Sequence, residues 1–239
     1  MRGGILIYHT ISTHERWLPA GIATPPGQFA EHMVMLRRSR LRAVPLAEMV
    51  EHCLTHGRLP RGAVAVTFDD GYTDNFTAAA PVLRAMNIPA TFFVATDFIG
   101  LRWQSPLGPI PAIRREQIVR MAAEPLFTFG SHAASHRTMT ELAPDALQRE
   151  MLRSAAALES LTGERIDLLA YPFGDFDERV MAAAAACGYR AAFAVHARRA
   201  GPMSIPRIPV HTRDNPRRLG FKLSRWYRPV RRILRAGAT

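Results

Sequence analysis

The segment Ala63-Val64-Ala65-Val66-Thr67-Phe68-Asp69-Asp70-Gly71-Tyr72 decides the fold of this chain, because an apolar run rich in small and β-branched residues ends abruptly in acidic residues and a glycine. Six largely apolar residues bounded by a turn signal are typical of a strand that is buried on both faces. We therefore expect a strand over residues 63–68 that delivers the carboxylates of Asp69 and Asp70 to a loop.

The same pattern recurs on both sides of this segment. Apolar, strand-like runs occupy residues 4–9, 43–46, 90–95, 126–129, 166–171, 191–195 and 205–210. Segments with helical spacing of apolar residues lie between them, at residues 26–38, 49–54, 78–86, 114–123, 144–161 and 178–187. This alternation predicts an α/β fold in which parallel strands are joined by crossover helices. Several of the strands end in polar residues, as strands do at the catalytic face of a barrel.

Length and composition are those of one packed domain. The 239 residues are 48% hydrophobic and 21% charged, which excludes a disordered or fibrous chain. Cys53 and Cys187 do not form a Cys-x-x-Cys pair and are expected to be reduced core thiols. The apolar run near the first residue is shorter than that of a signal peptide, and no stretch approaches the roughly 18 apolar residues of a membrane span, so we expect a cytoplasmic protein.

The positive charge is concentrated near the carboxyl end. Residues 207–239 hold ten basic side chains and one acidic residue, Asp214, so that only +2 of the formal net charge of +11 belongs to the rest of the chain. We predict a catalytic domain over residues 1–211 and a basic amphipathic tail over residues 212–239, with a helix break near Pro229. The apolar spacing within the tail is carried by Leu219, Leu223, Trp226, Val230 and Ile233.

Three interpretations of this tail are open. Residues 219–235 could contact an anionic membrane surface, as basic amphipathic helices do. Their apolar face could instead dock on the domain, which leaves the arginines in solvent. Nucleic acid is disfavoured as a partner, because the charge is confined to one end and no recognised binding module accompanies it.

A second polar cluster, Gly130-Ser131-His132-Ala133-Ala134-Ser135-His136, follows another apolar run. Two histidines four residues apart can bind one metal ion from a single turn. Taken alone, this spacing can be incidental, and Asp-Asp-Gly is more often a simple turn. Together, two histidines and one carboxylate would make a three-ligand site with an open position for water, and the other carboxylate would be free to act as a base.

The order and spacing of Thr67-Phe68-Asp69-Asp70-Gly71-Tyr72, Ser131 to His136, and Tyr171-Pro172-Phe173-Gly174 closely resemble the polysaccharide deacetylase family, carbohydrate esterase family four. The resemblance extends from residues 5–9 to residues 206–210 and implies a distorted (β/α) barrel of seven or eight strands. It implies a metal-dependent hydrolase that removes an N-acetyl group from a sugar. The metal ligands it implies are Asp70, His132 and His136, with zinc as the expected ion and cobalt or nickel as alternatives. It further implies Asp69 as general base, and Tyr72, Pro172 and Phe173 as the substrate-binding and oxyanion residues.

The chain departs from the family pattern in three respects. Ala170 stands where the family has the arginine that orients the base, and Ala133 replaces a hydroxyl residue after the first metal histidine. The late Leu-x-x-His motif that supplies the general acid is missing from its usual place. Leu6-Ile7-Tyr8-His9 has that form at the start of the chain, as in circularly permuted members of the family.

We therefore hypothesise that His9 is the general acid and that Arg207 takes the place of the missing arginine beside Asp69. His211 is a rival acid, because it follows the strand-like run at residues 205–210. The alternative for Arg207 is a plain surface charge ahead of the basic tail.

These features predict a cytoplasmic metal-dependent N-deacetylase that acts on an amino sugar of a glycan or of a lipid-linked glycan precursor. A location at the inner face of the membrane is compatible with the basic tail. Two alternatives stay open. The chain could be an inactive family member that binds a glycan or a partner protein, or an amide hydrolase that acts on a small cyclic metabolite.

Overall fold

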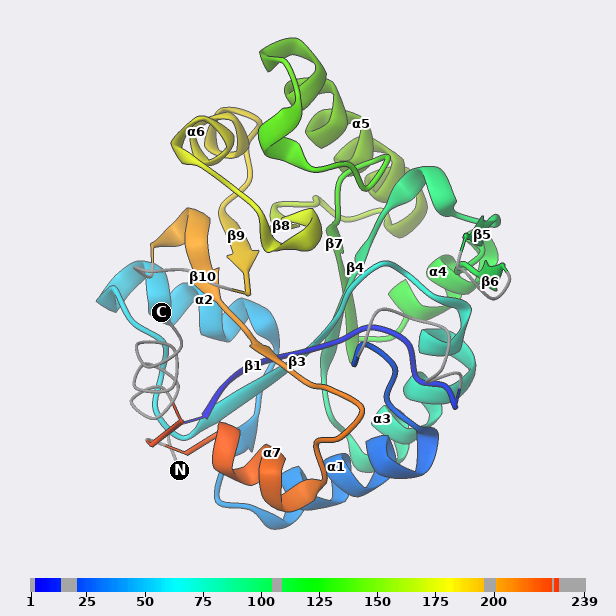
Figure 1. Cartoon of the computed structure of the whole chain (residues 1–239), viewed down its shortest axis with the longest axis vertical. Helices are drawn as coiled ribbons and strands as arrows, with labels where there is room; N and C mark the ends of the chain where they lie inside the picture. Colours follow the sequence, from blue (N-terminus) through cyan, green and yellow to red (C-terminus); the bar gives the residue numbers. More distant parts are fainter. Residues whose placement is uncertain (1–2, 14–20, 105–108, 196–200, 225, 228–239) are drawn as a thin grey trace.

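The computed structural model of the chain describes residues 3–13, 21–104, 109–195, 201–224 and 226–227. Strands occupy the centre of the molecule and helices surround them (Figure 1). The strands are β1 (Gly3–Tyr8), β2 (Arg42–Ala43), β3 (Ala63–Phe68), β4 (Ala90–Val94), β5 (Arg102–Trp103), β6 (Ile110–Pro111), β7 (Phe127–Ser131), β8 (Leu168–Ala170), β9 (Ala191–Ala194), β10 (Ile205–Pro206) and β11 (Ile208–Pro209). The helices are α1 (Pro26–Arg38), α2 (Leu46–His56), α3 (Ala80–Met86), α4 (Arg115–Ala122), α5 (Pro144–Thr162), α6 (Glu178–Ala186) and α7 (Pro216–Lys222).

The main sheet is parallel and nearly closed. Its strands follow the order β10-β9-β8-β7-β4-β3-β1-β11, and β2 pairs with β3 outside this path. The two ends of the path, β10 and β11, are separated in the chain by Arg207 alone. The sheet therefore curves round until one short segment touches both of its edges, which confirms the predicted distorted (β/α) barrel.

The prediction of a single strand over residues 205–210 is wrong, because this segment pairs with two different strands. Ile205 pairs with Phe193 of β9, whereas Ile208 pairs with Leu6 of β1. Pro206 has no N–H with which to continue a ladder, and at Arg207 the chain leaves β9 and joins β1. The segment is thus two short strands that close the barrel.

Side-chain alternation along β3 decides what faces the barrel interior. Val64, Val66 and Phe68 belong to the larger hydrophobic core, which includes residues of α1, α3, α4 and α5. Ala63 and Ala65 belong to a second core, together with Phe93 of β4 and Phe193 of β9. Because side chains alternate with a period of two, Thr67 and Asp69 continue the inner face on which Ala63 and Ala65 lie.

Local sequence signals explain where several helices begin and end. Pro144 lies in the first turn of α5, and Gly163 ends that helix in the left-handed conformation at φ 71°. The Asp177 carboxylate caps α6 by accepting a hydrogen bond of 2.7 Å from the Val180 N–H. The hairpin of β5 and β6 was not predicted, because strands of two residues are too short to show alternation. Cys53 and Cys187 are free thiols, as the sequence predicts.

The first part of the basic tail packs on the barrel. Leu219 and Leu223 are fully buried, and the Gly3 N–H donates to the Leu223 carbonyl at 3.1 Å. For these two residues the structure agrees with docking on the domain. Residues 228–239, including Pro229, lie outside the described part of the chain. The division into domains of residues 1–211 and 212–239 stays a prediction. Among the described residues, no helix is long and apolar enough to span a bilayer.

A buried ion pair anchors this carboxyl-terminal segment. The Lys222 ammonium donates to the Asp214 carboxylate and to the Pro209 carbonyl, the latter at 2.7 Å. The Asp214 main-chain carbonyl accepts hydrogen bonds from His32 and from Gln28 of α1. Asp214 is only 2% exposed, so this acidic residue joins β11, α7 and α1 from within.

We expect Asp214→Asn to lower the free energy of unfolding by about 3–5 kcal/mol, because the Lys222 charge would remain buried opposite a neutral amide. Urea denaturation followed by circular dichroism measures the change. Glu48→Gln is the matched control, since it neutralises a carboxylate in an exposed pair with Arg42 and should cost no more than about 1 kcal/mol. Equal losses in the two variants would contradict the anchoring role of Asp214.

Candidate active site

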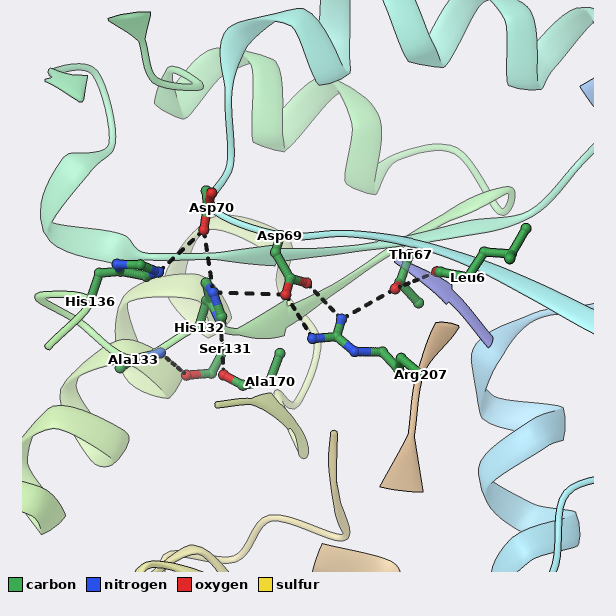
Figure 2. A network of polar contacts seen from close by, with 10 residues as sticks. All are labelled: Leu6, Thr67, Asp69, Asp70, Ser131, His132, Ala133, His136, Ala170 and Arg207. Carbon is green, nitrogen blue, oxygen red and sulfur yellow. Dashed lines mark hydrogen bonds and ion pairs between the residues drawn. The ribbon is translucent and has the colours of Figure 1, made fainter. Parts of the chain in front are cut away.

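The polar residues of the site lie just beyond the carboxyl ends of neighbouring strands. Asp69 and Asp70 follow β3, His132 follows β7, and His9 follows β1. Because these strands are parallel, their carboxyl ends meet at one rim of the barrel. Figure 2 shows Asp70, His132 and His136 pointing toward one another, with Asp69 and Arg207 beside them.

Asp70, His132 and His136 form a compact group of metal-ligand type. Asp70 Oδ1 lies 3.2 Å from His136 Nε2 and 3.3 Å from His132 Nε2, and the three ligand atoms all lie within 4.8 Å of one another. Bonds of about 2.0–2.1 Å in a tetrahedral shell would place neighbouring ligand atoms about 3.3 Å apart. The spacing, with two imidazole nitrogens and one carboxylate oxygen, therefore fits a divalent ion such as zinc.

A hydrogen bond from the ring orients His132. Its Nδ1 lies 2.7 Å from the Ala170 carbonyl, which can only accept, so this nitrogen carries the proton and Nε2 faces Asp70. At this position, where the family has an arginine, the main chain still contributes to the site. Burial lowers the pKa of His132, but the carboxylates of Asp69 and Asp70 outweigh it and leave the pKa raised.

Asp69 is held by Arg207. Nη1 and Nη2 of Arg207 donate to Oδ1 and Oδ2 of Asp69, each at 2.7 Å, and Nη1 also donates to Thr67 Oγ1 at 3.2 Å (Figure 2). The guanidinium lies 5.2 Å from the ring centroid of Phe93. Arg207 is only 3% exposed, so the alternative of a plain surface charge is wrong for this residue. Burial raises the pKa of Asp69, but the charges of Arg207 and then His132 outweigh burial and leave the pKa below its ordinary value.

His9 comes from the end of β1. Its main-chain carbonyl accepts a hydrogen bond of 2.8 Å from Asn75, and its Nδ1 is buried with no hydrogen-bond partner among the described residues. Burial lowers the pKa of His9, and the nearby Asp70 and Asp69 carboxylates oppose that effect. The rival His211 is exposed, and partial desolvation followed by the Lys222 charge lowers its pKa.

The three residues predicted to contact substrate differ in exposure. Phe173 is 68% exposed, and its ring centroid lies 4.7 Å from that of His136. Pro172 is buried beneath it. Tyr72 is also buried, and burial followed by the Asp70 charge raises the pKa of its hydroxyl. Phe173 is thus the member of this set that meets solvent at the rim.

Backbone strain is concentrated at the same rim. The described non-glycine residues with positive φ are Asp70, Asn87, Ala133, His136 and Phe173. Asn87 ends α3, whereas the other four belong to the site or to the loop between its histidines. Left-handed non-glycine residues cost about 1–3 kcal/mol each and tend to cluster at functional sites. Nothing in the alternation of apolar residues predicts these angles.

An aromatic pair lies beside the metal-ligand group. Trp103 of β5 stacks on Phe98 with ring centroids 3.7 Å apart and lies edge-on to His136 at 5.1 Å. The Trp103 ring therefore packs against one side of His136, and Phe173 packs against the same imidazole. The contact of Trp103 with His136 depends on the hairpin of β5 and β6, whose strands of two residues show no alternation in the sequence.

In comparisons with known proteins, the chain is similar to polysaccharide deacetylases. The family model described as polysaccharide deacetylase matches residues 56–192. The Bacillus subtilis protein YxkH is 29% identical over 187 residues, which are 78% of this chain and 62% of that protein. The poly-beta-1,6-N-acetyl-D-glucosamine N-deacetylase of Staphylococcus epidermidis is 23% identical over 195 residues, which are 77% of this chain and 66% of that protein. The chain thus spans less than two thirds of the length of either relative.

A solved structure supports the fold. The Streptococcus pyogenes deacetylase PplD, solved in complex with acetate, superposes with a TM-score of 0.80 at 23% sequence identity, and the match covers 94% of this chain and 99% of that one. The family model covers more than half of the chain and includes Asp69, Asp70 and both histidines of the metal-ligand group. On this basis the chain belongs to the polysaccharide deacetylase family.

Proposed function

We propose that this chain is a metal-dependent hydrolase that removes an N-acetyl group from an amino sugar of a glycan or of a lipid-linked glycan precursor. The observation that carries the proposal is the position of Asp69, an ionised carboxylate held by Arg207, next to the group of Asp70, His132 and His136. The name of the Staphylococcus epidermidis relative, a poly-beta-1,6-N-acetyl-D-glucosamine N-deacetylase, supports an N-acetylated sugar as the substrate class.

Asp70, His132 and His136 are the proposed metal ligands, with zinc as the preferred ion and cobalt or nickel as alternatives. A divalent ion bound there would polarise an amide carbonyl and lower the pKa of water. Asp69 is the proposed general base, and its Oδ2 lies 3.8 Å from His132 Nε2 on the side facing the ligands. Because Arg207 binds both carboxylate oxygens, the base keeps a fixed orientation while it accepts a proton from water.

The remaining proposed roles concern the acetyl group and the departing amine. The Phe173 main-chain N–H would stabilise the negative charge that develops on the carbonyl oxygen. Tyr72 and Pro172 would form the wall beneath the acetyl group. His9 would donate a proton to the amine nitrogen as the C–N bond breaks, and the products would be acetate and a free amino sugar. The circularly permuted order of motifs, on which the assignment of His9 depends, stays a prediction.

Two alternatives are kept. An inactive family member would bind a glycan or a partner through this rim without turnover, and the replacements at Ala170 and Ala133 are the reason to consider it. Against that, Arg207 lies on Asp69 with the bidentate geometry expected of an orienting arginine. An amide hydrolase that acts on a small cyclic metabolite would use the same chemistry and differs in substrate alone.

The first prediction from the proposed function concerns the base. With Zn²⁺ or Co²⁺ bound, the protein should release acetate from chitooligosaccharides or from lipid-linked N-acetylated sugars, and Asp69→Asn should lower turnover by about 10²–10⁴-fold because the proton acceptor is lost. Acetate is measured enzymatically and metal content by mass spectrometry. Arg207→Met should also lower turnover while metal binding persists, since it disorders the base and leaves the ligands in place.

Removal of the metal with a chelator should abolish acetate release. Asp167→Asn serves as a carboxylate control, because Asp167 pairs with Arg190 at the amino ends of β8 and β9, away from the site. Silence across the sugar panel from a protein that binds one metal ion would favour the inactive member or the cyclic-amide hydrolase. Full activity in Arg207→Met would contradict the orienting role of that arginine.

The second prediction distinguishes His9 from His211 as the acid. His9→Ala should lower amide hydrolysis by about 10²–10⁴-fold, because an amine must be protonated before it leaves. The same variant should retain hydrolysis of para-nitrophenyl acetate, whose leaving group needs no proton. His211→Ala is the matched comparison and should keep both activities. The opposite pattern would assign the acid to His211, and parallel loss of both activities in His9→Ala would indicate a structural role.

The third prediction concerns contact of residues 219–235 with an anionic membrane. In the described part of this segment Leu219 and Leu223 are buried, whereas Phe221 is 42% and Trp226 is 57% exposed, close in sequence to the exposed arginines Arg217 and Arg218. Lipid contact would therefore involve these aromatic rings and the basic residues that follow. Like this membrane contact, a cytoplasmic location at the inner membrane face stays a prediction.

Deletion of residues 228–239 together with Phe221→Ser and Trp226→Ser should weaken binding to vesicles that contain phosphatidylglycerol, as measured by flotation, because it removes apolar contacts and about 1 kcal/mol of attraction per basic residue. Purely zwitterionic vesicles are the control. The variant retains Leu219 and Leu223 so that the barrel stays intact. Unchanged binding of this variant to the anionic vesicles would rule out membrane contact through residues 219–235.

A further inference from the structure

The loop between the two histidines of the metal-ligand group holds a backbone conformation that its sequence does not favour. Ala133 has φ 61° and His136 has φ 55°, although neither is glycine. Side chains in this left-handed region cost about 1–3 kcal/mol each, so the loop keeps this shape only if surrounding contacts fix it. The spacing of His132 and His136 as metal ligands depends on those contacts.

Glu150 of α5 makes contacts of this kind. Its Oε2 accepts the N–H groups of Ala134 at 3.1 Å and Ser135 at 2.8 Å, and its Oε1 accepts the Ser135 hydroxyl at 2.9 Å. The Glu150 side chain is only 13% exposed. Hydrogen bonds to a carboxylate are stronger than those between neutral groups, and partial burial strengthens them further. One side chain thus binds the two residues that lie between the strained positions.

A second contact from the same helix secures the start of the loop. Ser154 lies one turn beyond Glu150 and is fully buried, and its hydroxyl bonds that of Ser131 at 2.8 Å. Ser131 Oγ in turn accepts the Ala133 N–H at 3.2 Å (Figure 2). Residues four apart on a helix lie on one face, so a single face of α5 supports the loop at both positions.

The opposite side of the loop is held by the turn after β4. The Thr96 N–H donates to the Ala133 carbonyl at 3.3 Å, and the Asp97 N–H donates to the Ala134 carbonyl at 2.9 Å. Arg153 of α5 bonds the Asp97 carboxylate at 2.5 Å and lies 3.9 Å from Glu150 Oε1. The donors and acceptors of the loop backbone are therefore bound on two sides, and α5 connects the two.

We propose that Glu150 is a positioning residue that preorganises His132 and His136 for metal binding. The proposal rests on the metal site of the proposed function, and Glu150 itself is not a ligand. Without its carboxylate, the Ala134 and Ser135 N–H groups would turn to water and the strained angles would relax. The ion would then have to order the loop as it binds, and supporting residues of this kind typically change metal affinity by about 10–100-fold.

The experiment is a zinc titration by calorimetry, with a competing chelator, of the full chain and its variants. Glu150→Ala should weaken zinc affinity by about 10–100-fold. Glu150→Gln should recover part of it, because the amide oxygen can accept the two backbone N–H groups and the amide NH₂ can donate to Ser135, although a neutral amide binds them less strongly than a carboxylate. The matched control is Glu159→Ala, since that carboxylate of the same helix accepts the Ile166 N–H at 3.0 Å, in a different loop.

Absorption of the cobalt-loaded protein gives a second readout, because Glu150→Ala should change the ligand-field bands whereas Glu159→Ala should leave them as in the wild type. The melting temperatures of the metal-free proteins show whether a variant has lost overall stability rather than the order of the loop alone. Unchanged zinc affinity in both Glu150 variants, or an equal loss in Glu159→Ala, would overturn the proposal. If Glu150→Ala does not fold, the affinity of Glu150→Gln against Glu159→Gln decides, with a measurable loss expected for Glu150→Gln alone. A wild type that binds no zinc would instead refute the metal site itself.

Discussion

The buried pair of Arg207 and Asp69 is the interaction on which barrel and site both depend. Arg207 lies between β10, which pairs with β9, and β11, which pairs with β1. Its guanidinium therefore enters the interior from the segment that closes the sheet. Both of its terminal nitrogens bind Asp69 at 2.7 Å, and the Thr67 hydroxyl and the Phe93 ring complete its surroundings. Loss of one member would leave a buried charge uncompensated, at a cost of about 3–5 kcal/mol. Closure of the barrel and orientation of the carboxylate are therefore one constraint.

This constraint explains why Ala170 is compatible with the site. The family resemblance places an orienting arginine at that position, on β8, whereas here the guanidinium arrives from the segment between β10 and β11. Ala170 belongs to the inner core with Ala63 and Ala65, and its carbonyl orients His132 instead. A small residue on β8 and a long cation in the closing segment thus orient His132 and Asp69, respectively.

The sequence was informative wherever alternation and turn chemistry act alone. The apolar run at residues 63–68 predicts β3 with its observed bounds, and it predicts that two carboxylates follow it. The split at Arg207 could not be predicted, because Ile205 and Ile208 are equally apolar and only tertiary pairing assigns them to different neighbours. Leu219 and Leu223 fit a membrane-facing stripe as well as a core, and burial alone distinguishes them. The positive φ of Ala133 has no local signal, because the carboxylate of Glu150 that stabilises this loop is distant in sequence.

The adjacent carboxylates pose the remaining physical problem, since two neighbouring buried charges of one sign repel each other. The backbone resolves it at Asp70, whose φ of 71° turns this side chain away from the direction that Asp69 takes into the barrel. Asp69 then meets Arg207, and Asp70 meets His132 and His136. Each carboxylate has its own positive or metal-binding partner, and the two halves approach at the 3.8 Å between His132 Nε2 and Asp69 Oδ2. A strained residue at the end of β3 is thus what allows one strand to supply both the proposed metal ligand and the proposed base.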